Sequence, residues 1–414
     1  MACILCWFLI PTNSLRRPFR RHNSNIVSSF TTENSSNGTI SSEDKLVRHS
    51  HPRIPTSLYP DIQTLLDDIE RTKNIDCDLT TPCHLMSRDS SYTKSWTLAD
   101  WDRHNVKPLV RYVRHIRSWS TSSTARSVIP IVLLSMMYSI AVCLVAHLHR
   151  GMHDFLRKAS LKSGLLGSFS SPIALLLTLR TNRAMDRLLD GRKSLGLMNR
   201  ATRTLTGLYF AYVAPYDGHV AILAARYIAL LPWCLKALLR GEDDELCIRS
   251  MLPSHEVEWL MSSPSDNPTA ILARLRMLTS VCSTRSIDGT TMMLQNSVHL
   301  RMCELLYDLE QVVGINKRIL GSPIPPTFTR HTSRLLCVYL SLLPFSLLGF
   351  GISMFAVIIT CALTTYIMVG IDEIGLEIEN ALAILPMHSL CQTMQKNVMD
   401  QVTLMRDMPD IVIS

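Results

Sequence analysis

Ser171, Leu175 and Leu179 follow one another at intervals of four residues, and Arg180 comes directly after them. On a helix this spacing places the three side chains on one face. If several copies of such a helix surround an axis, the two leucines form a narrow apolar neck that gates by dewetting. Leucines at this spacing are also ordinary in any transmembrane helix, and the spacing alone favours that simpler interpretation.

Pro172 suits the first turn of a helix, with Ser170 or Ser171 as the capping residue. A helix that begins inside a membrane presents free N–H groups and the positive end of its dipole. Both features stabilise an anion. The sequence therefore predicts a helix N-terminus close to the row of three residues.

Motifs for enzyme chemistry are missing, because the sequence has no G-x-S-x-G, no P-loop and no H-E-x-x-H. The 12 cysteines are scattered. Cys77 with Cys83 and His84 is the nearest approach to a metal-ligand cluster, and it is too sparse to predict a site. We therefore expect no enzyme, no metal and no cofactor.

The elements that must position these residues are membrane spans. The segment from Leu335 to Ile371 contains no Asp, Glu, Lys, Arg or His. A helix needs about 20 apolar residues to cross a bilayer, so this segment makes two spans, and Gly349 and Gly351 allow a tight reversal between them. Two more uncharged stretches precede it. The sequence predicts four spans, at about 127–146, 163–180, 334–350 and 352–371.

Basic residues flank the spans unequally. They cluster before the first span and after the second, and fewer lie in the loop between these two. The positive-inside rule then puts both termini and the long middle segment on the cytoplasmic side or its equivalent. Most of the net charge of +8 is therefore juxtamembrane, and we expect a lipid bilayer as partner and no nucleic acid.

The rest of the chain divides into three parts. Residues 1–90 are rich in Ser, Arg and Asn behind a short apolar run, which predicts a largely disordered targeting segment. Within it, Pro60–Thr72 is compatible with one short amphipathic helix. Residues 191–326 show helical spacing and predict a soluble helical region, and residues 391–414 are expected to be a tail. The class is all-α.

Four stretches resemble the bestrophin family, in particular its bacterial and plastid thylakoid members. They are WTLADWDRHNVKPLVRYVRHIRSWSTSSTARSVIP (residues 96–130), SSPIALLLTLRTNRAMDRLLDGRKSLG (170–196), GSPIPPTFTRHTSRLLCVYLSLLPFSL (321–347) and GIDEIGLEIEN (370–380). They occur in the order and at the spacing of the family. We take residues 91–390 as the bestrophin-like domain.

The resemblance implies a homopentameric anion channel. Its neck would fall on Ser171, Leu175 and Leu179, and its second constriction on Ile324. Relatives usually carry Ile or Phe at the neck, so Ser171 implies a wetter upper end. The residues expected to attract anions or line the vestibule are Arg180, Arg183, Arg330 and His331; the last two could equally cap a span.

The sequence departs from the family after the fourth span. Relatives continue E-N-P-F-G, whereas this chain has Glu379-Asn380-Ala381-Leu382-Ala383. The acidic cluster that serves calcium in animal members is missing, and calcium prefers six to eight oxygen ligands. We therefore predict no activation by calcium. Thylakoid relatives also lack that dependence and respond to voltage.

An acidic motif lies just past the fourth span and consists of Asp372, Glu373, Glu377, Glu379 and Asn380. One interpretation pairs its carboxylates with Arg180, Arg183 and Arg187, and another makes it a gating ring. We favour the pairing, because unpaired charges near lipid are costly.

The resulting hypothesis is passive, voltage-dependent flow of chloride, with bicarbonate and nitrate as further candidates, through a pentameric pore in a plastid thylakoid or envelope membrane. One alternative is a non-conducting scaffold or accessory subunit, which the altered E-N-A-L-A motif allows. A proton-coupled transporter or carrier enzyme is less compatible with the sequence, because the four spans hold no charged residue apart from Arg180 and Arg334 at their ends.

Overall fold

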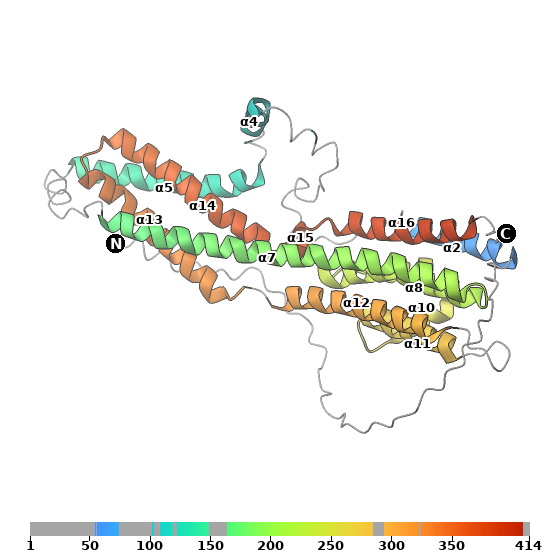
Figure 1. The fold of residues 1–414 in the computed structure, drawn as a ribbon. Helices are drawn as coiled ribbons and strands as arrows, with labels where there is room; N and C mark the ends of the chain where they lie inside the picture. Colours follow the sequence, from blue (N-terminus) through green and yellow to red (C-terminus); the bar gives the residue numbers. More distant parts are fainter. Residues whose placement is uncertain are drawn as a thin grey trace, which may run out of the picture. The chain divides into compact units, whose positions relative to one another are not determined.

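The computed structural model describes residues 54, 56–73, 102, 108–117, 119, 122–148, 164–284, 294–322 and 324–408. All of them belong to one unit, residues 52–414. This part of the chain contains helices and no strand, as the sequence predicts. Figure 1 labels the main helices along the chain.

Four helices carry the predicted spans. They are α5 (Ser123–Leu148), α7 (Gly164–Leu208), α13 (Pro326–Gly349) and α14 (Met354–Glu379). The second predicted span is the first part of α7, and Ser163 lies outside the described residues. Helix α5 packs along α14, and α7 packs against both α13 and α14.

Two apolar layers hold these four helices together. One joins α5, α13 and α14 around Val357 and Cys361. The other joins all four helices through Val128, Ile173, Leu177, Leu336 and Val369. Lipid supplies no hydrophobic drive for association, so close apolar contact and interhelical hydrogen bonds must supply the stability.

A polar contact between α5 and α14 connects the two apolar layers. The hydroxyls of Ser135 and Thr365 lie 2.8 Å apart. Nearby, the Tyr138 hydroxyl donates to the Ser341 carbonyl oxygen at 3.2 Å and ties α5 to α13. Such bonds are worth a modest amount each in a membrane.

The predicted reversal between the last two spans is present. Helix α13 ends at Gly349, and Gly351 follows with a φ of 74°. A positive φ strains residues that have a Cβ, so glycine fits this position. Ser353 then caps α14, because its side chain accepts a hydrogen bond from the Ala356 N–H.

The remaining helices form the second region, which we call the soluble region. They are α2 (Tyr59–Lys73, after a 3₁₀ turn at Thr56–Leu58), α8 (Gly218–Arg240), α9 (Glu245–Met251), α10 (Ser254–Ser262), α11 (Asn267–Thr284), α12 (Asn296–Gly321), α15 (Ala381–Ile384) and α16 (Met387–Arg406). The second half of α7, followed by a π-helical turn at Tyr209–Val213, runs into this region. The short helix α4 (Pro108–Arg117) precedes α5.

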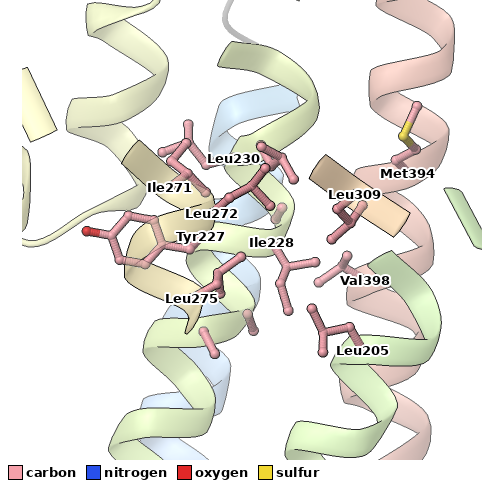
Figure 2. Close-up of a cluster of buried hydrophobic side chains, with 14 of the residues drawn as sticks. Leu205, Tyr227, Ile228, Leu230, Ile271, Leu272, Leu275, Leu309, Met394 and Val398 are labelled. Carbon is pink, nitrogen blue, oxygen red and sulfur yellow. The ribbon is translucent and has the colours of Figure 1, made fainter. Parts of the chain in front are cut away.

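The core of the soluble region surrounds α8. Figure 2 shows Leu205 of α7, Ile228 of α8, Leu275 of α11, Leu309 of α12 and Val398 of α16 converging there. All five side chains are fully buried. Burying one such side chain stabilises the fold by about 1.5–3 kcal/mol.

Helix α8 is apolar and long enough to cross a membrane, like α5, α13 and α14. However, 83% of its apolar window is buried inside the protein. A predominantly apolar helix belongs in a core or in a membrane, and the apolar side chains of this one are in a core. This burial agrees with the sequence prediction of a soluble element.

Two domain predictions were wrong. Residues 56–73 do not belong to a disordered leader, because Ile62, Leu65 and Ile69 of α2 lie buried in the soluble core. Residues 391–406 are not a tail, because Val398 and Val402 of α16 are buried in the same core. Both segments have the spacing of an amphipathic helix. The apolar face of each helix becomes buried only when helices distant in the sequence pack against it.

Candidate functional site along helix α7

Helix α7 separates its residues into a buried side and an uncovered side. Ile173 and Leu177 are 3% and 2% exposed and pack into the apolar layer of the four spans. Leu175 and Leu179, in contrast, are 59% and 45% exposed, and Ser171 is exposed beside them. The predicted row therefore lies on the side of α7 that the chain's own helices leave uncovered.

The predicted helix start at Pro172 was wrong. Helix α7 spans Gly164–Leu208 and holds Pro172 inside it. A proline inside a helix removes one backbone hydrogen bond, which neighbouring helices make tolerable in a membrane. The free N–H groups of a helix end are therefore not at the level of Ser171, and a dipole contribution to anion binding at that level is not available.

Arg180 does not attract anions, contrary to one of our predictions. Its side chain is 1% exposed, and its guanidinium donates one hydrogen bond to Asp372 and another, at 3.3 Å, to Glu379. A buried charge is stable only when it is paired and hydrogen-bonded. Arg180 therefore fixes the acidic end of α14 to α7.

Helices α7 and α14 approach each other closely at this ion cluster. A Cβ on the buried Gly375 would stand 3.4 Å from the Thr181 hydroxyl oxygen and 3.9 Å from the Arg180 Cδ. The missing side chain lets the Arg180 stem lie against the α14 backbone. The favoured interpretation of the acidic motif, pairing with a basic residue of α7, is confirmed for Asp372 and Glu379.

Arg187 plays a part that the sequence analysis missed. It was expected to pair with carboxylates, but its guanidinium donates to two backbone carbonyls, Ser322 and, at 2.7 Å, Ile319. These carbonyls belong to the last turn of α12 and the residue after it, where a cation satisfies free acceptors and the helix dipole. The sequence offered no signal for this contact, because α12 already carries a basic residue, Arg318, in its last turn.

The hydrogen bonds of Arg187 also fix the end of α12 next to Ile324, the predicted second constriction. Ile324 is half-buried and lies in the short connection between α12 and α13. Arg330 and His331 are exposed in the first turns of α13. Arg183 is exposed on α7, one turn beyond Leu179. Arg183 is thus a helical neighbour of Leu179, whereas Ile324, Arg330 and His331 lie just before and within the first turns of α13.

The altered E-N-A-L-A segment folds into α15. Asn380 ends α14, and Ala381 and Leu382 are buried. Glu373 and Glu377 are half-buried on α14. Helix α15 packs against α7, α8 and α14. The departure from the family motif therefore supplies an apolar link between the spans and the soluble core.

The described part of the chain holds no cluster of three or more His, Cys, Asp or Glu side chains suited to a metal ion. Cys77, Cys83 and His84 lie outside that part.

Four packed helices have exposed apolar faces, and one of them continues into a second helical region. This arrangement defines an all-α integral membrane protein. A family model described as "Bacterial/Fungal Bestrophin protein" matches residues 102–400. This match covers well over half of the chain, so the protein belongs to the bestrophin family.

Named relatives and solved structures agree with that family. The chain is 29% identical over 259 residues to "Voltage-dependent anion channel-forming protein alr2987" of Nostoc, covering 60% of this chain and 80% of the relative. It is 25% identical over 317 residues to "Voltage-dependent chloride channel 1, chloroplastic" of Arabidopsis thaliana, covering 74% and 72%. A bacterial bestrophin homologue from Klebsiella pneumoniae (mutation Y211A) shares the fold with a TM-score of 0.60 at 22% identity, covering 67% of this chain and 99% of that structure.

Proposed function

We propose that the protein is a passive anion channel and not an enzyme, and that it works as a homopentamer around one axis. The observation that carries this proposal is the uncovered row Ser171, Leu175 and Leu179, opposite the buried side of α7. Five copies of α7 with this side inward would form a closed ring, as cyclic symmetry requires. The names of the relatives in Nostoc and Arabidopsis support anion conduction.

The neck would work by controlling water. Leu175 and Leu179 carry no hydrogen-bonding group, so an anion passing them must give up part of its hydration shell. A ring of ten leucine side chains is a constriction of the kind that closes by dewetting. Ser171 adds hydroxyls at one end of this constriction and would ease the entry of a partly hydrated ion.

The electrostatic attraction would come from exposed cations at the end of the spans. Arg183, Arg330 and His331 are all exposed in the single chain. Cations that line one mouth raise the local concentration of anions there. Arg180 is excluded from this role by its pairing, and Ile324 would form a second, apolar constriction on the same route.

Calcium is not part of the proposed gating. Two of the carboxylates that would be needed for a calcium site, Asp372 and Glu379, are already bonded to Arg180. Voltage is the stimulus we propose, in keeping with the names of the relatives. Chloride is the proposed main ion, with bicarbonate and nitrate as further ones, and the chloroplastic relatives favour a plastid membrane.

The test is a current measurement on the purified full chain in planar bilayers under a potassium chloride gradient. We expect a reversal potential near the chloride equilibrium value, a conductance that changes with voltage, and no change when calcium is chelated. A pentamer that carries no current would contradict the proposal and favour a non-conducting accessory subunit. A reversal potential near that of potassium would contradict anion selectivity.

A further inference from the structure

Helix α4 (Pro108–Arg117, PLVRYVRHIR) has two chemically opposite faces. Leu109, Tyr112, Val113 and Ile116 recur at intervals of three and four residues and share one face. The other face is basic and carries Arg111, Arg114, His115 and Arg117. A helix with this division must cover its apolar face with something.

None of the described helices covers that face. No side chain between Leu109 and Arg117 is buried, and Leu109 and Ile116 are 77% and 67% exposed. The apolar layers of the spans and the core of the soluble region include no residue of α4. A contiguous exposed apolar surface of this kind marks an interaction site.

Trp119 shows where α4 stands relative to the bilayer. It follows α4 by two residues, and its ring lies 5.5 Å from that of Tyr366 on α14. Tyr366 precedes the first charged residue of α14, Asp372, by six residues, or about 9 Å along the helix. Trp and Tyr are enriched at the boundary between lipid tails and water. Helix α4 therefore reaches α5 at that boundary.

The charge around α4 matches one occupant. The sequence has no Asp or Glu from Arg103 to His153, and five arginines or lysines lie between Lys107 and Arg126. A folded partner surface usually offers carboxylates in a fixed pattern, whereas a bilayer offers an apolar layer beneath a sheet of headgroups. Only the bilayer offers an apolar layer for the apolar face and negative headgroups for the basic face of a helix lying flat.

We propose that α4 lies in the surface of the bilayer, with its apolar face in the acyl boundary and its basic face on anionic lipid headgroups. The helix would hold the start of α5 at a fixed depth. This inference depends on the membrane location alone and does not require that the protein conducts ions.

The test compares probes on the two faces. The full chain carries an environment-sensitive fluorophore at Ile116→Cys or at Arg114→Cys, in vesicles containing nitroxide-labelled lipids. Cys3, Cys6, Cys77, Cys83 and the two partly exposed cysteines, Cys303 and Cys337, are replaced by Ser. We expect strong quenching of the probe at position 116 and several-fold weaker quenching at position 114. Equal quenching at both positions, or a blue-shifted probe at position 116 that lipid does not quench, would overturn the proposal. The second outcome would mean that protein, such as a neighbouring subunit, covers the face.

A second comparison tests the headgroup contact. Each cation near an anionic surface favours docking by about five-fold, so replacing Arg111, Arg114 and Arg117 by Gln should weaken docking on the order of 100-fold. Quenching at position 116 should then fall in vesicles that contain phosphatidylglycerol. The control replaces Arg192 and Arg203, two exposed arginines of α7, by Gln and should leave the quenching unchanged. Quenching that is the same with and without phosphatidylglycerol in the parent chain would contradict a role for anionic lipid.

Discussion

Helices α5 and α8 have similar length and are both apolar enough to cross a membrane, but they have different surroundings. Only 22% of the apolar window of α5 is buried within the chain, against 83% for α8. The protein's own core surrounds α8, whereas most of α5 is left to lipid or to another subunit. Apolar composition therefore shows that a helix avoids water, and it does not show which apolar medium the helix enters.

The difference can be traced to charged residues within the helix. Helix α8 carries Arg226, which pairs with Asp68 at 2.7 Å, and Lys236, which lies 3.2 Å from Glu242. Both partners belong to the soluble region. Helix α5 holds no charged residue between Ser127 and Ala146. A lysine inside a membrane span is costly unless a group that can pair with it lies at the same depth.

The largest effect expected in the soluble region comes from removing α2. A chain that starts at Ile54 keeps Ile62, Leu65 and Ile69 in the core, whereas a chain that starts at Asn74 loses them. With Leu58 and Leu66, five buried side chains are lost, on the order of 10 kcal/mol, which matches the whole stability of an ordinary domain. We expect the shorter chain to be recovered only as aggregate in size-exclusion chromatography. Equal thermal stability of the two chains would contradict the assignment of α2 to the core.

The largest single-residue effect in the spans is expected at Arg180. Arg180→Met leaves Asp372 and Glu379 partly buried without their cation, which costs about 3–5 kcal/mol. The melting temperature of the detergent-solubilised protein should fall accordingly. Adding Asp372→Asn and Glu379→Gln should restore much of the loss, because the uncompensated charges are then gone. A single variant as stable as the parent would contradict the structural role of this cluster.

A matched pair of leucines sharpens the comparison of α5 with α8. Leu230→Ala in α8 empties a fully buried site and should cost about 2–5 kcal/mol. Leu144→Ala in α5 changes a side chain that is 57% exposed, where lipid can fill the space, and should cost less than about 1 kcal/mol. Thermal unfolding in the same detergent measures both. Similar losses would mean that the outer face of α5 is packed as tightly as the core.

A smaller effect, with a dependence on pH, is expected at Glu256 in the soluble region. Burial acts to raise the pKa of its carboxyl, but hydrogen bonds from Arg274 and from Tyr227, the latter at 2.7 Å, outweigh burial and lower the pKa below its usual value of 4.5. Because the folded pKa is the lower one, the carboxylate stabilises the fold above about pH 4.5. That stability is lost as the pH falls through the folded pKa.

Glu256→Gln should therefore lower stability by about 1–3 kcal/mol at neutral pH and flatten its decline in acid. Denaturant unfolding at several pH values measures both effects. Glu258→Gln, two residues further along and exposed on α10, is the matched control. A variant with the same acid-induced decline as the parent would show that other groups set the acid response.

The spans and the reversal at Gly351 could be predicted from the sequence because they follow from long uncharged runs and one backbone requirement. The family motifs also pointed to the row on α7, which lies on the uncovered side of that helix. The start of α7 could not be predicted, because a proline suits both the first turn of a helix and, when neighbouring helices support it, the interior. The pairing of Arg180 and the core positions of α2 and α16 depend on contacts across more than 150 residues, which no local pattern encodes.

The central claim is that the uncovered row of α7 lines the path of the anions, and one measurement tests it most directly. Single-channel and macroscopic chloride currents should be recorded for Leu175→Ala and for Leu363→Ala, whose parent leucines are 59% and 58% exposed on α7 and α14. We expect Leu175→Ala to raise the resting chloride conductance about ten-fold, which corresponds to a permeation barrier lower by about 1.4 kcal/mol. Leu363→Ala should leave the conductance unchanged. Equal currents in both variants and the parent would contradict the central claim, because the row would then face lipid or another subunit and not the pore.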